Sequence, residues 1–510
     1  MNAINYSAAR SVRAHALSVL GARPVLACVL SLSAAAAILA VPTLGAQGSV
    51  SKLDRTKQPA AGAVPATMIP TWTKSKLANG AELVVSVKKD LPLVAVAIAF
   101  VGGSTNFEPA DKVGMAGFTA QMLSEGTSTK NADDFSNAQQ MLGTSINAGI
   151  ASESGTLGFT ALKDRVDAAL SLAADMMLNP KFPAEALERI RGRALVGLQQ
   201  SRDQPNAIAA NIFAKINYGD AHPYGRIATE ASVKAITRDD IVAFHKAYYT
   251  PGHAVISVVG DVDPAKVKAS IEKAFAAWTS GGERPKFTFP AMPAQKARTI
   301  YLVDKPKAAQ SVFMLGLPGP DRYTPDYYAI QVMNTLLGGL FQSRLNHNIR
   351  EVKGYSYGVN SGFAYGRGPG QFQAGGGIVT AKTDSALIEF MKELRGVQGA
   401  IPFTDDEITQ GKDALVQSLP RTFSSVNGVR GAISGIYVQD LPEQYYQEYA
   451  AKVNGVTRDD LVRVAKKYID VDHLNIIIVG DRAVIEAALR QTGIAPIVIL
   501  DVDGKPVITP

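Results

Sequence analysis

The sequence predicts an α+β fold made of two homologous domains, and a long internal repeat is the first reason. The stretch VKAITRDDIVAFHKAYYTPGHAVISVVGDVD begins at Val233, and VNGVTRDDLVRVAKKYIDVDHLNIIIVGDRA begins at Val453. The copies align without a gap, so they are offset by 220 residues, from 233 to 453. Because solenoid repeats have periods of about 20–50 residues, a period this long indicates two related domains.

The second reason is the order of strand-like and helix-like segments. The runs AELVVSVKK from Ala81 and LVAVAIAFV from Leu93 are rich in β-branched residues and predict strands. These runs stand close together ahead of the helical patterns. This order favours α+β layers over a doubly wound sheet. The next stretch, KVGMAGFTAQMLSEGTSTK from Lys112, has the apolar spacing of an amphipathic helix.

Each copy of the repeat predicts the same series of elements. Thr237 and Thr457 are the expected N-caps of amphipathic helices, and a turn then leads to a β-branched strand that ends in Gly-Asp. Further upstream, KFPAEALERIRGRALVGLQQ from Lys181 is similar to PFTDDEITQGKDALVQSL from Pro402 at almost the same offset. A Gly/Pro-rich stretch between the two halves is the natural linker. The expected segments are a signal peptide (1–46), a flexible lead-in (47–70), an N-terminal domain (71–278), the linker (279–297), a C-terminal domain (298–490) and a C-terminal tail (491–510).

The N-terminus has the composition of an export signal. Three arginines (Arg10, Arg13 and Arg23) precede a run without charge that ends in the small residues Gly45 and Ala46. We expect cleavage near residue 47, and therefore a periplasmic or secreted protein. Mitochondrial import is the alternative. Mitochondrial presequences are amphipathic, however, and this uninterrupted apolar run is not. The segment before Cys28 is only weakly similar to a lipoprotein cleavage box, because Arg23 interrupts its apolar stretch.

Composition excludes several classes of function. Loss of the three leader arginines lowers the formal charge from +7 to +4, which is too little and too scattered for nucleic-acid binding. Cys28 is the only cysteine, so the mature chain has neither disulfides nor thiolate chemistry. Beyond the leader, no apolar run has the length of a membrane span.

Two further motifs identify a family resemblance. AHPYGR at 221–226 and YYTPGHAVISVVGDVD from Tyr248, together with the repeat, resemble the pitrilysin (insulinase) superfamily over 71–483. The smaller two-domain members are the most similar, namely the subunits of mitochondrial processing peptidase and their bacterial relatives. The resemblance implies that each domain is a mainly antiparallel sheet packed against helices. It also implies a non-catalytic subunit, which in this family pairs with a catalytic one.

The zinc motif of that superfamily, His-x-x-Glu-His on a helix, is degenerate in this sequence. Aligned by the flanks VGGSTNFEP and SEGT, the first His falls on Gly117, the Glu on Ala120 and the second His on Gln121. The superfamily's further Glu ligand falls near Gly197, where no carboxylate is available. We therefore expect no metal and no cofactor on this chain, and the resemblance implies zinc in a partner subunit.

Other candidate ligands fit structural roles better. Glu185 and Glu188 are expected on a solvated helix face. His253 and His473 occupy matching places in the repeat, and His222 precedes a proline in an expected turn. After loss of the leader, no pair of histidines has the three- or four-residue spacing of helical zinc ligands. The histidines are His15, His222, His245, His253, His347 and His473.

The second half carries the candidate substrate-binding residues. The resemblance places the superfamily's Arg and Tyr, which reach substrate across the cleft, on Arg350 and Tyr357. Both side chains donate hydrogen bonds, so they can stabilise a carbonyl oxygen on which negative charge develops. The alternative is that Arg350 pairs with Glu351 and that Tyr357 is a strand aromatic. Arg344 is expected to be structural.

Three hypotheses for function follow. The leading hypothesis is a non-catalytic, substrate-binding subunit of an exported zinc metallopeptidase that cleaves peptides or unfolded proteins. A homologous partner with an intact zinc motif would form the heterodimer and supply metal and general base. The alternative is a peptidase-like scaffold or peptide-binding protein without proteolytic activity. An autonomous hydrolase is the weakest hypothesis, because a GxSxG elbow is absent.

Overall fold

The computed structural model describes residues 68–279 and 281–507. These described residues belong to one compact unit. The expected signal peptide, Cys28 and nearly all of the expected lead-in 47–70 lie outside the described residues. No helix in the described ranges has the length and hydropathy needed to cross a membrane.

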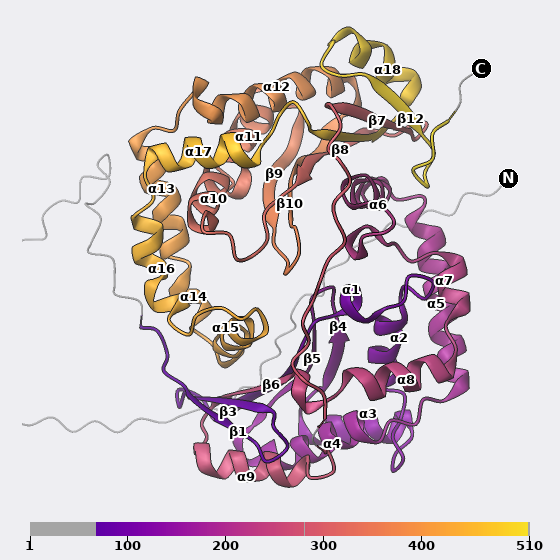
Figure 1. Cartoon of the computed structure of the whole chain (residues 1–510), viewed down its shortest axis with the longest axis vertical. Coiled ribbons are helices and arrows are strands. Elements are labelled where there is room, and N and C mark those ends of the chain that lie inside the picture. Colours follow the sequence, from indigo (N-terminus) through magenta and orange to yellow (C-terminus); the bar gives the residue numbers. More distant parts are fainter. Residues whose placement is uncertain (1–67, 280, 508–510) are drawn as a thin grey trace, which may run out of the picture. The chain divides into compact units, whose positions relative to one another are not determined.

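The described strands form two six-stranded sheets, one in each half of the repeat (Figure 1). The N-terminal sheet has the order β1-β2-β6-β3-β5-β4, and the C-terminal sheet has the order β12-β7-β11-β8-β10-β9. Most neighbours are antiparallel; only the pairs β2–β6, β7–β11 and β7–β12 are parallel. The first sheet consists of β1 (Thr73–Lys76), β2 (Glu82–Val87), β3 (Leu93–Val101), β4 (Asn147–Ile150), β5 (Ser154–Leu162) and β6 (Ala254–Gly260). The second consists of β7 (Thr299–Asp304), β8 (Gln310–Pro318), β9 (Ser356–Ala364), β10 (Gln371–Val379), β11 (Asn475–Gly480) and β12 (Ile497–Leu500).

The predicted α+β class and the duplication are confirmed. Thr237 caps α8 (Arg238–Tyr248) and Thr457 caps α17 (Arg458–Tyr468), and each threonine accepts a hydrogen bond from the backbone N–H three residues later. Each helix leads into a strand, β6 or β11, that ends at the predicted glycine. The same local signals, cap, helical period and β-branched run, therefore produce the same unit twice.

Helices cover the sheets in both halves (Figure 1). In the first half they are α1 (Ser104–Phe107), α2 (Met115–Met122), α3 (Ala132–Leu142), α4 (Val166–Leu178), α5 (Ala184–Ser201), α6 (Pro205–Tyr218), α7 (Glu230–Ala235), α8 and α9 (Pro264–Ala274). In the second half they are α10 (Tyr327–Asn334), α11 (Arg344–Asn346), α12 (Thr383–Arg395), α13 (Asp405–Val416), α14 (Leu419–Thr422), α15 (Val426–Val438), α16 (Tyr445–Asn454), α17 and α18 (Arg482–Gln491).

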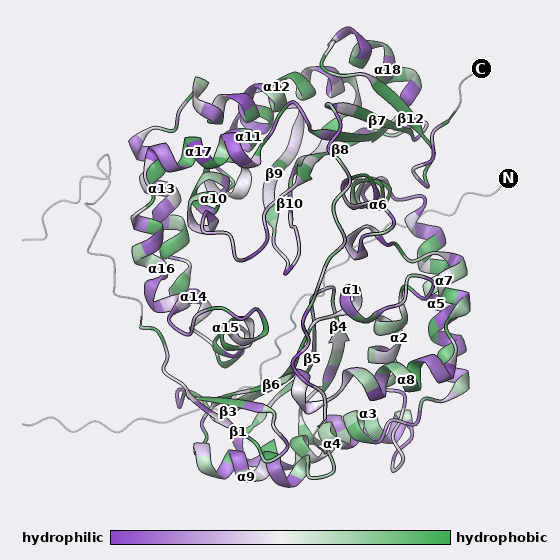
Figure 2. Cartoon of the chain, viewed as in Figure 1, coloured by the Kyte–Doolittle hydropathy of each residue, from purple (hydrophilic) through white to green (hydrophobic). Residues whose placement is uncertain are grey.

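The segment 491–510, which we expected to be a tail, contributes a strand to the second sheet. β12 pairs with β7 in parallel, and its sequence Ile-Val-Ile-Leu is drawn as hydrophobic in Figure 2. Asp503, just after this strand, pairs with Arg202 at 2.9 Å. The second domain therefore extends past the predicted boundary at residue 490, because an apolar strand at a sheet edge stays buried there.

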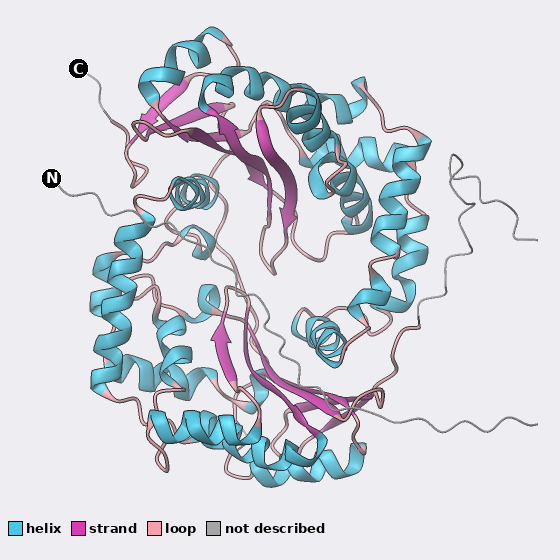
Figure 3. Cartoon of the chain, turned by 180° about the vertical axis from the view of Figure 1, so that it is seen from behind, coloured by secondary structure: helices cyan, strands magenta, loops and turns pink. Residues whose placement is uncertain are grey.

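The two halves exchange one helix each. Helix α15 of the second half packs on β3 and β6 of the first sheet, and α6 of the first half packs on β8 and β11 of the second sheet (Figures 1 and 3). The middle of the β3 face toward α15 carries the small residues Ala95, Ala97 and Ala99, so the helix can approach closely. There the hydroxyls of Ser257 and Ser434 hydrogen-bond at 2.7 Å.

The described part of the expected linker 279–297 contains no helix or strand, and it is packed against both halves. Phe287 stacks edge-on against Phe107, and Phe289 stacks on His222. Arg284 hydrogen-bonds the Tyr437 carbonyl and the Asp440 carboxylate. These contacts are expected to limit the relative motion of the two halves.

Candidate functional site

Helix α2 is anchored at its N-terminus by the half-buried carboxylate of Glu108. The Glu108 Oε1 atom accepts hydrogen bonds from the backbone N–H groups of Gly114, at 3.1 Å, and Ala116, at 2.6 Å. Burial raises the pKa of Glu108, and these two backbone hydrogen bonds oppose that shift. A carboxylate at this end also interacts favourably with the helix dipole. These hydrogen bonds fix the orientation of α2.

The three degenerate motif positions lie on α2. A side chain at Gly117 would meet no atom within 4 Å, and Ala120 is buried with 4% of its surface exposed. The exposed Gln121 turns its amide back to donate to the Gly117 carbonyl at 3.3 Å. Glycine and alanine offer no side-chain ligand, and an amide is not a ligand that zinc prefers. These residues do not fit a zinc ion.

The position aligned with the further acidic ligand is also open. Helix α5 packs against α2, and a side chain at its Gly197 would meet no atom within 4 Å. Glu185 and Glu188 are exposed on α5, as predicted, and Glu188 pairs with Arg191 at 3.1 Å. Within residues 68–279 and 281–507, no three His, Cys, Asp or Glu side chains are grouped to hold a metal.

The histidines occupy separate structural places. His222 is fully buried at the predicted turn, where its Nδ1 atom accepts from the Tyr224 N–H at 3.2 Å, and burial lowers its pKa. His253 is buried directly before β6. The matching His473 is more exposed and lies 2.7 Å from the Asp470 carboxylate. The equivalent positions in the repeat thus have different surroundings.

Arg350 and Tyr357 lie on neighbouring elements of the second half. Arg350 is in a short π-helical turn (His347–Val352) that packs against β9, and Tyr357 is on β9 with 88% of its surface exposed. The Arg350 guanidinium stacks 4.3 Å from the Phe341 ring and pairs with Glu351 at 3.3 Å. The pairing that we considered as the alternative is therefore present. Their role toward substrate stays a prediction.

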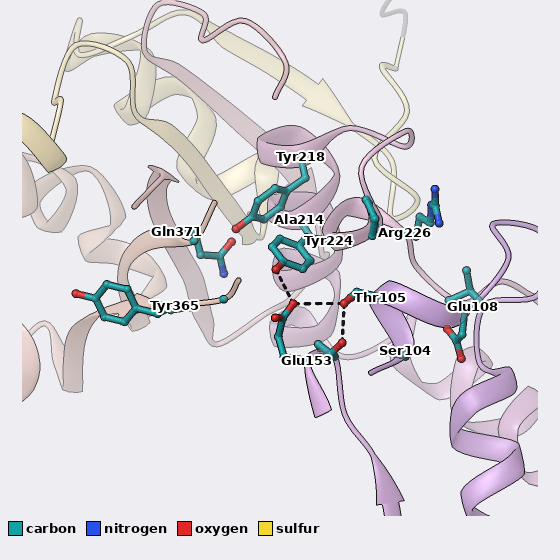
Figure 4. A pocket seen from close by; sticks show the side chains of 16 residues that line it. Ser104, Thr105, Glu108, Glu153, Ala214, Tyr218, Tyr224, Arg226, Tyr365 and Gln371 are labelled. Atoms are coloured by element: carbon teal, nitrogen blue, oxygen red, sulfur yellow. Dashed lines mark hydrogen bonds between the residues drawn. The ribbon is translucent and has the colours of Figure 1, made fainter. Parts of the chain in front are cut away.

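A cavity of about 370 Å³ lies where the two halves meet (Figure 4). It is lined by α1, the C-terminal part of α6 and the β9–β10 connection. Within it, the Glu153 carboxylate accepts from the Tyr224 hydroxyl at 2.5 Å and from the backbone N–H of Arg367 at 3.0 Å. Burial, reinforced by Glu153, raises the pKa of Tyr224 far above its usual value. The phenol therefore stays protonated and works as a donor.

This carboxylate joins the halves, because Glu153 belongs to the first and Arg367 to the second. Sequence reasoning missed Glu153 and Glu108 as organising residues. Glu108 stands in the quoted stretch VGGSTNFEP and Tyr224 in AHPYGR, so both were within recognised motifs. Glu153 depends on Tyr224 and Arg367, which are distant in sequence, so no local pattern indicates its role.

Arg344 is structural, as expected. It forms two hydrogen bonds to the Glu407 carboxylate, at 2.7 and 2.8 Å, and it donates to the Pro402 carbonyl at 2.9 Å. Its guanidinium also stacks 4.3 Å from the Phe403 ring. The hydrogen bonds from Arg344 lower the pKa of Glu407 to about 2. The bidentate pair fastens α11 to the start of α13.

Arg344→Ala should lower the free energy of unfolding at neutral pH by about 2–3 kcal/mol, because a half-buried carboxylate loses its charged donor. The folded-state pKa of Glu407 is depressed, so this stabilisation is present above its unfolded pKa of about 4.3. It should disappear as the pH falls from there to about 2. Urea unfolding at a series of pH values measures the difference between variant and wild type.

Arg458→Ala is the matched control, because Arg458 pairs with the exposed Asp405 on the same helix, α13. An exposed pair contributes about 1 kcal/mol or less. Equal losses in the two variants would contradict a special role for Arg344.

Comparison with known proteins agrees with this architecture. Residues 83–225 match the family model described as insulinase (peptidase family M16), and residues 235–415 match the model of the peptidase M16 inactive domain. Together these two models of one family match more than half of the chain. The chain belongs to peptidase family M16. This confirms the resemblance to the insulinase superfamily.

Several known proteins are similar to this chain over most of their length. The zinc protease YmxG of Bacillus subtilis is 26% identical over 350 residues, which are 68% of this chain and 84% of that protein. The crystal structure of a peptidase M16 inactive domain from Pseudomonas fluorescens has a TM-score of 0.74 and 27% identity, and covers 80% of this chain and 98% of that one. A chain of Complex III2 from Candida albicans shares the fold, with a TM-score of 0.66, 14% identity, and coverage of 83% and 99%.

Proposed function

We propose that this M16 protein is a non-catalytic, substrate-binding subunit of an exported zinc metallopeptidase. The observation that carries the proposal is helix α2, which is anchored by Glu108 but has Gly117, Ala120 and Gln121 in place of ligands and base. A homologous partner with an intact His-x-x-Glu-His motif would supply zinc and general base. Its substrates would be peptides or unfolded proteins.

The sheet edges support binding of extended peptides. β4 ends the first sheet and β9 ends the second, so each has backbone groups without a neighbouring strand in its sheet. An extended peptide can pair with such an edge. β4 also packs against α2, so a peptide on that edge would lie beside the degenerate motif. Asn147 and Gly149 of β4 are exposed there.

The second half supplies two hydrogen-bond donors. Tyr357 is 88% exposed on the edge strand β9, and the adjacent turn carries Arg350. In the proposed complex both side chains donate to a substrate carbonyl in the partner's active site. Arg350 would have to exchange its pairing with Glu351 for that role, which involves a weak, half-exposed ion pair.

A scaffold or peptide-binding protein without proteolytic activity is the second candidate. The Arg350–Glu351 pair favours it, because this pair occupies the guanidinium within its own chain. In that case Arg350 and Tyr357 would have no effect on any proteolytic reaction. The residues 1–46 support export to the periplasm or secretion, with mitochondrial import as the alternative.

The purified mature chain tests the proposal. We expect less than stoichiometric zinc in elemental analysis and no cleavage of a fluorogenic peptide library by the chain alone. Addition of its homologue with an intact His-x-x-Glu-His motif should produce zinc-dependent cleavage that neither chain shows alone. About one zinc per chain after mild chelation, or cleavage by the chain alone, would refute the non-catalytic assignment. Assembly without any gain of cleavage would favour the scaffold.

A further inference from the structure

A polar pocket of about 670 Å³ lies at the free end of the first sheet. Its walls are the end of α3 with the following loop, the edge strand β4, the exposed face of β5 and one turn of α15. Helix α15 covers β3 and β6 but leaves this end of the sheet open. Among the described residues that line the pocket, Arg430 of α15 is the only charged one.

The Arg430 guanidinium has no counter-ion among residues 68–279 and 281–507. No hydrogen bond or salt bridge joins it to another described residue, and its buried Nε atom is without a partner. Burial lowers the pKa of this guanidinium. A partly buried charge without a partner lowers the stability of the fold. Such a charge is therefore expected mainly at functional sites. Arg344, which is also half-buried, is by contrast paired with the Glu407 carboxylate.

The sheet makes room for this side chain. Residue 158 of β5 is glycine, and a Cβ atom there would lie 3.0 Å from the Arg430 Nη1 atom. Next to it, Asn427 accepts a hydrogen bond from the Thr160 hydroxyl at 3.0 Å through its oxygen, so its amide N–H₂ remains available as a donor. The pocket thus contains a planar, positively charged guanidinium and a neutral amide donor. None of its described lining residues is a carboxylate that could neutralise the charge.

We propose that Arg430 binds a carboxylate of a peptide that lies along β4. A guanidinium matches a carboxylate through two parallel hydrogen bonds. A peptide is the favoured source because Asn147, Ala148 and Gly149 of the edge strand β4 form a wall of the same pocket. The carboxylate belongs to an aspartate or glutamate side chain or to the C-terminus of the peptide. This inference rests on the proposed peptide binding and adds a preference for acidic substrates.

Three fluorescently labelled peptides of alternating valine and threonine test it against the full mature chain. The first has a central glutamate and an amidated end, the second has glutamine at that place, and the third has glutamine and a free C-terminal carboxylate. Anisotropy titrations should show that an acidic peptide binds about 10-fold or more tightly than the neutral one, the scale of one charged hydrogen-bonded pair. The acidic peptide that binds more tightly than the neutral one identifies the source of the carboxylate.

Arg430→Met keeps the volume of the side chain and removes its charge, so it should abolish the preference and leave binding of the neutral peptide unchanged. Thermal unfolding should show that this variant is folded and at least as stable as wild type, because a charge without a partner is removed. Arg193→Gln, at an exposed position of α5, is the matched control and should keep the preference. Equal binding of all three peptides, or a preference that remains in Arg430→Met, would refute the carboxylate site at Arg430 but not the proposed peptide binding. Absence of binding by every peptide refutes the proposed peptide binding itself.

Discussion

A variant with Gly117→His, Ala120→Glu and Gln121→His, combined with Gly197→Glu on α5, should bind about one zinc ion per chain, whereas the wild-type chain should bind none. Residues four apart on a helix share a face, so two histidines on α2 can ligate one metal. Side chains at positions 117 and 197 meet open space, and α5 packs against α2. Elemental analysis and equilibrium titration with zinc measure the effect.

Gly192→Glu in place of Gly197→Glu is the matched control for this zinc-binding variant. Gly192 is also an open position of α5, but five residues away and therefore on another face of the helix. This control variant should bind zinc clearly less tightly. A folded variant with all four intended changes and no zinc would mean that α2 and α5 do not have the ligand arrangement of the family. The alignment of Gly117 and Gln121 with lost ligands would then be wrong.

Tyr357→Phe should reduce turnover by the proposed two-subunit complex by roughly 10²–10³, the scale of one lost oxyanion donor. The change removes only the hydroxyl of a side chain that is 88% exposed, so folding and assembly should be unaffected. The loss should fall mainly on kcat, because the donor acts on charge that develops in the transition state. Steady-state kinetics of the reconstituted complex measure it.

Tyr355→Phe provides the control. Tyr355 is a half-buried tyrosine two residues before Tyr357, and the change removes its hydroxyl. Its activity should equal that of wild type. Arg350→Ala is a less specific test, because the change also removes the stacking on Phe341 and the pair with Glu351. Full activity of a well-folded Tyr357→Phe complex would remove the main support for a proteolytic role. The scaffold function would then be preferred.

Local sequence signals determined the elements of the fold. The predicted strand LVAVAIAFV is β3, and the threonines at 237 and 457 cap α8 and α17 as expected. These features depend on residues within one or two turns of each other, so a single sequence contains the information. The duplication also follows from sequence alone, because the repeat has no gaps. The degenerate zinc motif is likewise a prediction from the sequence alone, since it rests on the alignment of Gly117, Ala120 and Gln121 with ligands and base.

Only the tertiary structure decided which parts of the two halves touch. The exchange of α6 and α15 and the addition of β12 to the second sheet join segments that are far apart in the sequence. Burial of apolar surface is non-directional, so an apolar segment does not specify which other segment covers it. For the same reason the sequence did not show that Glu153 joins the halves. It also did not show that the described residues place no carboxylate beside Arg430. A hydrogen bond or a missing counter-ion depends on distances of a few ångströms, and chain folding alone sets those distances.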